Sequence, residues 1–276
     1  MRILLAELAP VLGEPDRNLD RIDAALRAGP ADLAVFPELF LTGYRVGDRF
    51  HALALAPGDP AYERLGSLAR ERGCAIVVGA PTRSAERPGE IHNAALLVRP
   101  DGTTHLQAKR FLPTFGPFEE GVHFTEVDRS RPAALGDRLV GLEICYDAFF
   151  PEVSRELALG GAALLVAISA APVTSRRLFD RVLPARAIEN ALPVVYVNRV
   201  GVEDGFVFGG GSVALDARGE VIDGRPVELP GMAPEERLLS VDVDLSAPSR
   251  WRPFRPVLRD VSTRPGALPE GGPATG

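Results

Sequence analysis

The sequence predicts an α/β fold in which two β-sheets pack face to face and helices cover their outer faces. Apolar runs of strand length alternate with amphipathic helical segments, and hairpin turns interrupt this alternation. Stacked sheets with helices outside would bury both sheets. The 276 residues contain no repeat of fixed period and no interior linker, so we expect one domain over residues 1–265. A Pro/Gly-rich tail is expected at residues 266–276.

The N-terminal elements follow from apolar spacing. The continuous apolar run Ile3–Leu8 predicts a short buried strand. Asp16–Ala28 is expected to be a helix, because Leu19, Ile22 and Leu26 recur on one face.

The next strand and helix have clear boundaries. Asp32–Phe36 reads as a strand, and Ala75–Gly79 as another. Between them, Asp59 can cap a helix whose first position suits Pro60, and Gly73 ends it.

A hairpin and a further strand follow. Asn93–Arg99 and Thr103–Ala108 flank the turn sequence Pro-Asp-Gly, which predicts an antiparallel pair. Leu139–Ile144 is the next apolar run and is expected to be a strand.

The C-terminal half repeats the alternation. Pro151–Leu159 predicts a helix, and Ala163–Ile168 a strand. Ser175–Asn190 is expected to be helical but bent or divided at Pro184, and Pro193–Val197 is a strand.

The last expected elements are strands. Ser212–Asp216 and Glu220–Ile222 flank Ala217–Gly219 and predict a second hairpin, and Leu238–Val243 is the final clear strand.

Composition excludes several classes of function. The formal net charge is −6, and no basic stripe is present, so we expect no nucleic-acid or membrane partner. Two cysteines do not form a disulfide framework in a chain of this size. Glu7 comes too early for a signal peptide, and no apolar run is long enough to span a bilayer, so we expect a cytoplasmic protein.

Lys109 is the only lysine among 31 basic residues; the other 30 are arginines. Lysine is a compact point charge whose pKa shifts readily on burial, whereas arginine is planar and stays protonated. A lysine kept in this background indicates a site where a guanidinium does not serve. Chance retention is the competing explanation, and the neighbouring motifs decide against it.

Glu38, Lys109 and Cys145 each stand at or near the end of an apolar run. Their segments are VFPELFLTGY from residue 35, KRFLPTFGPFEE from residue 109 and GLEICYDAFFPE from residue 141. A carboxylate, an ammonium and a thiol in this order resemble the nitrilase (carbon–nitrogen hydrolase) superfamily. The resemblance extends from residue 3 to about residue 264 and implies an α-β-β-α sandwich.

The resemblance also implies the chemistry. Cys145 would attack an acyl carbon and form a thioester, with Glu38 as general base. Lys109 would stabilise the oxyanion together with a backbone N–H, that of Tyr146. We expect the ammonium to favour the thiolate and so to lower the pKa of Cys145. Cys74, at the mouth of a plain apolar strand, is assigned to the core.

A fourth site residue and three pocket residues complete the prediction. The resemblance implies that Glu120 orients the lysine and the substrate, with Glu119 as the alternative if the register shifts by one. Tyr44, Phe149 and Ala170 are expected to line the substrate pocket, together with Tyr146. Solvated loop glutamates are the competing explanation for residues 119 and 120.

We therefore predict an amidase that hydrolyses a small carboxamide. An N-carbamoyl-amide hydrolase, a nitrilase and a non-catalytic interaction protein of the same fold remain alternatives. Tyr196–Ser212 is also similar to the glutaminase domain of glutamine-dependent NAD synthetases, but no ATP-binding signature follows, so NAD synthesis is not expected. The chain lacks G-x-S-x-G, C-x-x-C, H-E-x-x-H and phosphate-loop motifs, so we expect no serine nucleophile, metal or cofactor.

The resemblance implies a homodimer that stacks two sandwiches. The chain itself offers two apolar-aromatic segments, Phe149–Pro151 and Trp251–Phe254, which a monomer would leave partly exposed.

Overall fold

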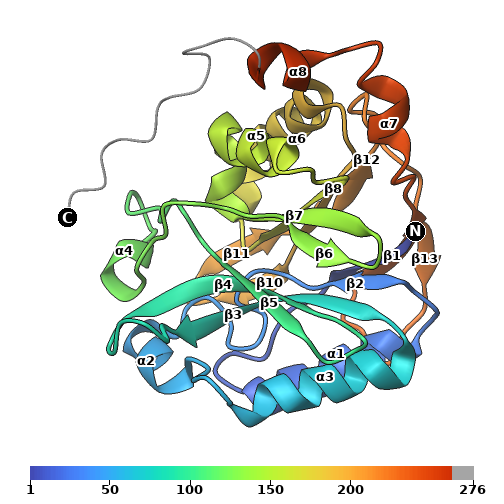
Figure 1. The fold of residues 1–276 in the computed structure, drawn as a ribbon. Helices are drawn as coiled ribbons and strands as arrows, with labels where there is room; N and C mark the ends of the chain where they lie inside the picture. The colour runs from blue at the N-terminus through green and yellow to red at the C-terminus, as the bar shows by residue number, and fades with distance from the viewer. Residues whose placement is uncertain (263–276) are drawn as a thin grey trace.

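The computed structural model describes residues 1–262, and two stacked sheets form its centre (Figure 1). The expected tail at 266–276 lies outside the described residues. The larger sheet contains, in chain order, β1 (Arg2–Glu7), β2 (Leu33–Val35), β3 (Ala75–Arg83), β4 (Ile91–Val98), β5 (Thr104–Ala108), β13 (Arg225–Val227) and β14 (Arg237–Asp242). Their spatial order is β13-β14-β1-β2-β3-β4-β5.

The second sheet has five strands, in the order β12-β9-β8-β7-β6. Its strands are β6 (Ala133–Leu135), β7 (Arg138–Ile144), β8 (Leu164–Ser169), β9 (Val194–Asn198) and β12 (Val213–Leu215). A separate hairpin joins β10 (Val200–Glu203) to β11 (Phe206–Gly209).

Four longer helices cover the two outer faces of the sandwich. They are α1 (Pro15–Arg27), α3 (Pro60–Arg72), α5 (Pro151–Leu159) and α6 (Arg176–Asn190). Helices α1 and α3 lie on the larger sheet, and α5 and α6 lie on the five-stranded sheet (Figure 1). The predicted α-β-β-α sandwich is confirmed. No helix within residues 1–262 has the length and hydropathy needed to cross a membrane.

Strand alternation builds the two interiors. On β1, Ile3 and Leu5 belong to the apolar core that includes the second sheet, whereas Leu4 and Ala6 pack in the cluster with α1 and α3. Successive side chains of a strand point to opposite faces, so a continuous apolar run is required where both faces are buried.

The predicted helix boundaries hold where capping residues set them. The Asp59 carboxylate accepts a hydrogen bond from the Ala61 N–H at 3.0 Å, and Pro60 begins α3. Gly73 ends the helix in the left-handed conformation, at φ 58°.

The structure refines two expectations. Of the two alternatives for the helix that contains Pro184, bent or divided, division is excluded: α6 is one continuous helix, and Phe179, Leu183 and Ala187 on either side of the proline are buried in the core. Their burial outweighs the cost of about 3 kcal/mol of an interior proline. In the second hairpin the turn forms, but residues 220–222 make only an isolated bridge to Leu215, which lies on β12.

Several short elements were not expected from the sequence. Besides β6, β10, β11 and β13, they are the helices α2 (Phe50–Leu53), α4 (Glu120–His123), α7 (Ala247–Trp251) and α8 (Val257–Ser262), with single 3₁₀ turns at Gly47–Arg49, Cys145–Phe149 and Val173–Ser175. Helix α4 and the 3₁₀ turn at residue 145 carry predicted site residues.

Candidate active site

Glu38 lies just beyond the end of β2 and is completely buried. Leu39 next to it has φ 49°, so the chain turns sharply here. Gly79 of β3 allows this turn, because a Cβ at that position would lie 2.5 Å from the Glu38 Cα atom and 2.2 Å from the Leu39 nitrogen. The close approach of two backbones fixes the carboxylate at the strand end.

Lys109 follows β5 directly, and its side chain is also completely buried. Its Nζ atom donates to Glu38 Oε1 at 2.7 Å and to both carboxylate oxygens of Glu120, at 2.7 and 2.8 Å. Burial alone would lower the pKa of Lys109, but the carboxylates of Glu120 and Glu38 outweigh it and raise the pKa. The lysine is therefore a permanent cation between two carboxylates.

The structure distinguishes between Glu119 and Glu120 as the carboxylate beside Lys109. Glu120 begins α4 and is buried, whereas the Glu119 side chain is 65% exposed and lies 4.0 Å from Arg45. Glu120 therefore contacts the lysine, and Glu119 does not share this site. Burial raises the pKa of Glu120, which Lys109 partly offsets.

Cys145 begins the 3₁₀ turn at the end of β7 and has φ 49°. This left-handed conformation is strained for a non-glycine residue, and such strain concentrates at functional sites. The thiol is 8% exposed and interacts electrostatically with Glu38, Lys109 and Glu120. The structure thus brings all four predicted residues into one buried cluster.

The expected depression of the Cys145 pKa is not observed. Burial raises the pKa of the thiol, Glu38 raises it further, and the opposing effect of Lys109 does not compensate. Desolvation and a nearby carboxylate both disfavour the thiolate. The free site therefore holds a thiol, and its activation requires a base to accept the proton.

Asn93 on β4 is a site residue that the sequence did not reveal. Its amide nitrogen donates to Glu38 Oε1 at 2.7 Å and to Glu120 Oε2 at 3.2 Å. The backbone N–H of Ala170 donates to the other Glu38 oxygen at 2.8 Å. Ala170 therefore orients the predicted base. An asparagine near the start of a largely apolar strand was the available signal.

Asp147 is a second residue missed from the sequence, although it lies two positions after the cysteine. Its buried carboxylate accepts hydrogen bonds from the backbone N–H groups of Arg110, Phe111 and Ile144, at 3.1, 2.9 and 3.2 Å. These bonds tie the segment after Lys109 to the strand that carries Cys145. Burial raises the pKa of Asp147 to about 7.

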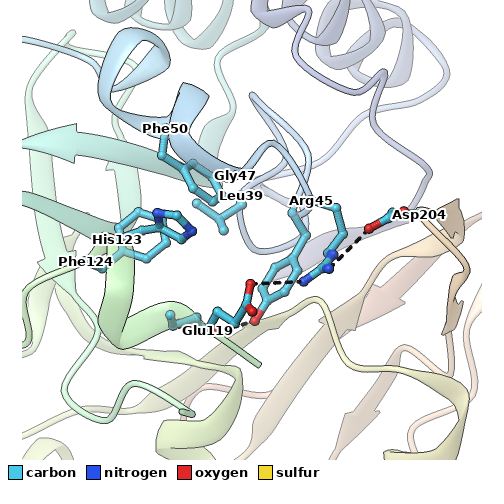
Figure 2. A pocket seen from close by; sticks show the side chains of 10 residues that line it. Leu39, Arg45, Gly47, Phe50, Glu119, His123, Phe124 and Asp204 are labelled. Atoms are coloured by element: carbon cyan, nitrogen blue, oxygen red, sulfur yellow. Dashed lines mark hydrogen bonds and ion pairs between the residues drawn. The ribbon is translucent and has the colours of Figure 1, made fainter. Parts of the chain in front are cut away.

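A cavity of about 150 Å³ lies beside this cluster (Figure 2). Its wall includes Tyr44, whose hydroxyl donates to Glu120 Oε1 at 2.6 Å. Arg45 lies between Glu119 and Asp204 at one side, and Figure 2 shows aromatic side chains, among them Phe50, on the other. Cys145 is not among the residues that line this cavity.

The other predicted pocket residues lie in an aromatic cluster after the cysteine. The ring of Tyr146 is 5.3 Å from that of Phe115 and 5.8 Å from that of Phe149, between ring centroids. The ring centroid of Phe149 is also 5.0 Å from that of Phe179 on α6. Cys74 is not part of this site. It is buried in the apolar cluster beneath α1 and α3, and burial raises its pKa to about 12.

Glu143, two residues before the cysteine, is a buried carboxyl outside the cluster. Its only hydrogen bond among the described residues comes from the Ser154 hydroxyl on α5, and burial raises its pKa to about 7 from an ordinary value of 4.5. Because the pKa is raised, the folded protein keeps the Glu143 proton at pH values at which the unfolded chain has lost it. The buried carboxyl therefore lowers the free energy of unfolding progressively as the pH rises towards 7.

Glu143→Gln is therefore expected to stabilise the fold more at about pH 8 than at about pH 5, by on the order of 3 kcal/mol. Urea unfolding at the two pH values measures this difference. Glu152→Gln makes the same change at an exposed position of the neighbouring helix α5, so it serves as the control and should change little. Equal effects of Glu143→Gln at both pH values would contradict the assignment.

Within residues 1–262, no group of three or more His, Cys, Asp or Glu side chains is arranged to hold a metal ion. The described site chemistry consists of a thiol, an ammonium and carboxyl groups.

Nearly the whole chain is similar to known carbon–nitrogen hydrolases. The carbon–nitrogen hydrolase family model matches residues 5–253. An (R)-stereoselective amidase from Pseudomonas sp. is 35% identical over 225 residues, which cover 80% of each chain. The crystal structure of the NitN amidase from Nesterenkonia sp. AN1 aligns with a TM-score of 0.75 at 34% identity, covering 92% of this chain and 97% of that one.

A glutamine-dependent NAD(+) synthetase from Thermotoga maritima is 32% identical over 272 residues, covering 96% of this chain. The chain spans about half the length of that relative, 46%. The family match, the shared sandwich fold and the identities above 30% together show that this chain belongs to the carbon–nitrogen hydrolase family of the nitrilase superfamily.

Proposed function

We propose that the protein is an amidase that hydrolyses a small carboxamide to a carboxylate and ammonia through a thioester on Cys145. The observation that carries this proposal is the buried Lys109 ammonium, held between Glu38 and Glu120 beside the thiol. Burying charged side chains costs free energy even when they are paired. A buried cluster of an ammonium and two carboxylates therefore indicates a functional site. Amidases among the relatives support the reaction class.

In the first half-reaction, Glu38 accepts the thiol proton while Cys145 Sγ attacks the carbonyl carbon. The tetrahedral oxyanion is stabilised by the Lys109 ammonium and the Tyr146 N–H. The C–N bond then breaks, and Glu38 returns the proton to the nitrogen, which leaves as ammonia. Because burial and Glu38 raise the pKa of the thiol, the attack requires a base that accepts its proton.

In the second half-reaction, water attacks the thioester. Glu38 takes the water proton and returns a proton to Sγ as the carboxylate is released. Lys109 has three N–H donors, and all three face carboxylate oxygens in the free site. One of these three bonds is therefore exchanged for a bond to the oxyanion. Glu120 accepts two of them, so it can give up one and still stay paired with the ammonium.

A relative supports the nucleophile. In a variant of the Nesterenkonia amidase, which is 32% identical with a TM-score of 0.75, acrylamide has added to the active-site cysteine.

Added hydroxylamine tests the reaction class, because it intercepts a thioester faster than water. The expected products from an accepted amide are ammonia and the hydroxamate of its acyl group, identified by mass. Hydroxyurea would indicate a carbamoylase instead, ammonia released from nitriles alone a nitrilase, and the absence of any product over a panel of amides, ureides and nitriles a binding protein.

We further propose a homodimer in the cytoplasm. Both cysteines are free, which suits a reducing compartment. Phe254 is 80% exposed, and Phe149 is only partly buried. Light scattering is expected to give twice the chain mass at micromolar concentration, because a partner would cover these apolar side chains. A monomer mass under the same conditions would rule the dimer out.

A further inference from the structure

A second and larger hollow lies at the β5 edge of the seven-stranded sheet, with a volume of about 500 Å³. We call it the edge groove. Its walls come from the end of β3, from β4 and β5, and from the loop at residues 127–131. None of Glu38, Lys109, Glu120 and Cys145 lines it, so it is separate from the candidate active site.

The edge groove is positively charged although the whole chain carries a net charge of −6. Arg83, Arg129 and Arg131 line it, against Glu86 as the single acidic residue of the lining. No carboxylate among the described residues pairs with any of the three guanidinium groups; Arg83 donates only to backbone carbonyl oxygens, those of Ala54 and His51. Unpaired guanidinium groups that share one concave surface attract a planar or tetrahedral anion.

Two histidines also line the groove. The His105 Nε2 atom is buried and has no hydrogen-bond partner among residues 1–262, so it is not open to a ligand in the groove. His92 is held by its Nδ1 atom, 2.7 Å from the Thr125 carbonyl oxygen, which fixes the ring at the groove wall.

The remaining lining is apolar or aromatic. Leu106 on β5 is 41% exposed, and Tyr62 of α3, which also lines the groove, is half-buried. The volume is within the range of sites for small organic ligands. An aromatic ring beside cationic side chains suits a ligand with a flat organic body and an anionic group.

We propose that the edge groove is a binding site for an organic phosphate of nucleotide size, with Arg129 and Arg131 contacting the phosphate and Tyr62 and Leu106 contacting the organic body. This site is additional to the amidase site and does not depend on the proposed reaction.

Isothermal titration with AMP, adenosine and inorganic phosphate tests the proposal on the full-length protein. AMP is expected to bind more tightly than either of its parts. Arg129→Ala/Arg131→Ala is expected to weaken AMP binding about 100-fold, because two charge-assisted contacts are lost and each is worth about a factor of ten. Amide turnover should be unchanged in this variant.

Arg17→Ala/Arg27→Ala is the matched control, because it removes two arginines from α1, where they pair with Glu14 and Asp23. It makes the same change in net charge and should leave AMP binding intact. Adenosine binding as tightly as AMP, equal weakening in the control, or no AMP binding at millimolar concentration would each overturn the proposal. Inorganic phosphate binding as tightly as AMP would overturn the role of Tyr62 and Leu106.

Discussion

Lys109→Arg is expected to reduce amide turnover by about 10²- to 10³-fold while the protein still folds. The substitution keeps the charge that compensates Glu38 and Glu120, so the buried carboxylates remain paired. The wider, planar guanidinium cannot occupy a completely buried ammonium site and also reach the oxyanion. Steady-state kinetics with a thermal melt measure both effects.

Arg110→Lys is the matched control, since it makes the reverse exchange at the adjacent position. Arg110 pairs with Glu156 away from the cluster, so turnover should hardly change. Lys109→Met should destabilise the fold by about 3–5 kcal/mol, because it leaves two buried carboxylates without their cation. Near-normal turnover in Lys109→Arg would refute the oxyanion role.

Cys145→Ala is expected to lower turnover by about 10⁴-fold or more, which is the largest single effect we predict. Without the thiol no acyl-enzyme forms, and the remaining groups supply only binding and oxyanion stabilisation. Alanine keeps the Cβ atom, so the substitution leaves the backbone strain at φ 49° unchanged and should not unfold the protein. Measurement of released ammonia under saturating amide gives the ratio.

Cys74→Ala separates this role from a general effect of losing a thiol. Cys74 is packed beneath α1 and α3, so its substitution should cost some stability and leave turnover per folded molecule unchanged. Comparable losses of turnover in the two variants would mean that Cys145 has no special role.

Local sequence signals predicted the long elements well. Strands β1 and β8 contain continuous apolar runs, β7 is largely apolar, and α3 has both a capping aspartate and a terminal glycine. Pro184 left two alternatives open in the sequence, a bent or a divided helix, and the structure has one helix because burial on both sides of the proline offsets its intrinsic cost. Strands such as β6 and β13 are three residues long, and their pairing with distant partners leaves no periodic pattern in the sequence.

The site was predictable as residue types but not as a network. Glu38, Lys109, Glu120 and Cys145 stand in recognisable segments, and the structure brings them together. Contacts made across strands, by Asn93 and Asp147, depend on register and strand order. The predicted direction of the Cys145 pKa shift was wrong. Burial of the thiol and the opposing effects of Glu38 and Lys109 depend on the folded structure and cannot be weighed from the sequence.

The central claim is a covalent acyl-enzyme on Cys145. Acid quenching during turnover of an accepted amide, followed by peptide mass spectrometry, tests it most directly. The predicted result is a mass increase equal to the acyl group on the peptide that contains Cys145, lost on treatment with hydroxylamine and absent from the Cys74 peptide. Unmodified Cys145 throughout turnover, in Glu38→Gln as well as the natural protein, would contradict it.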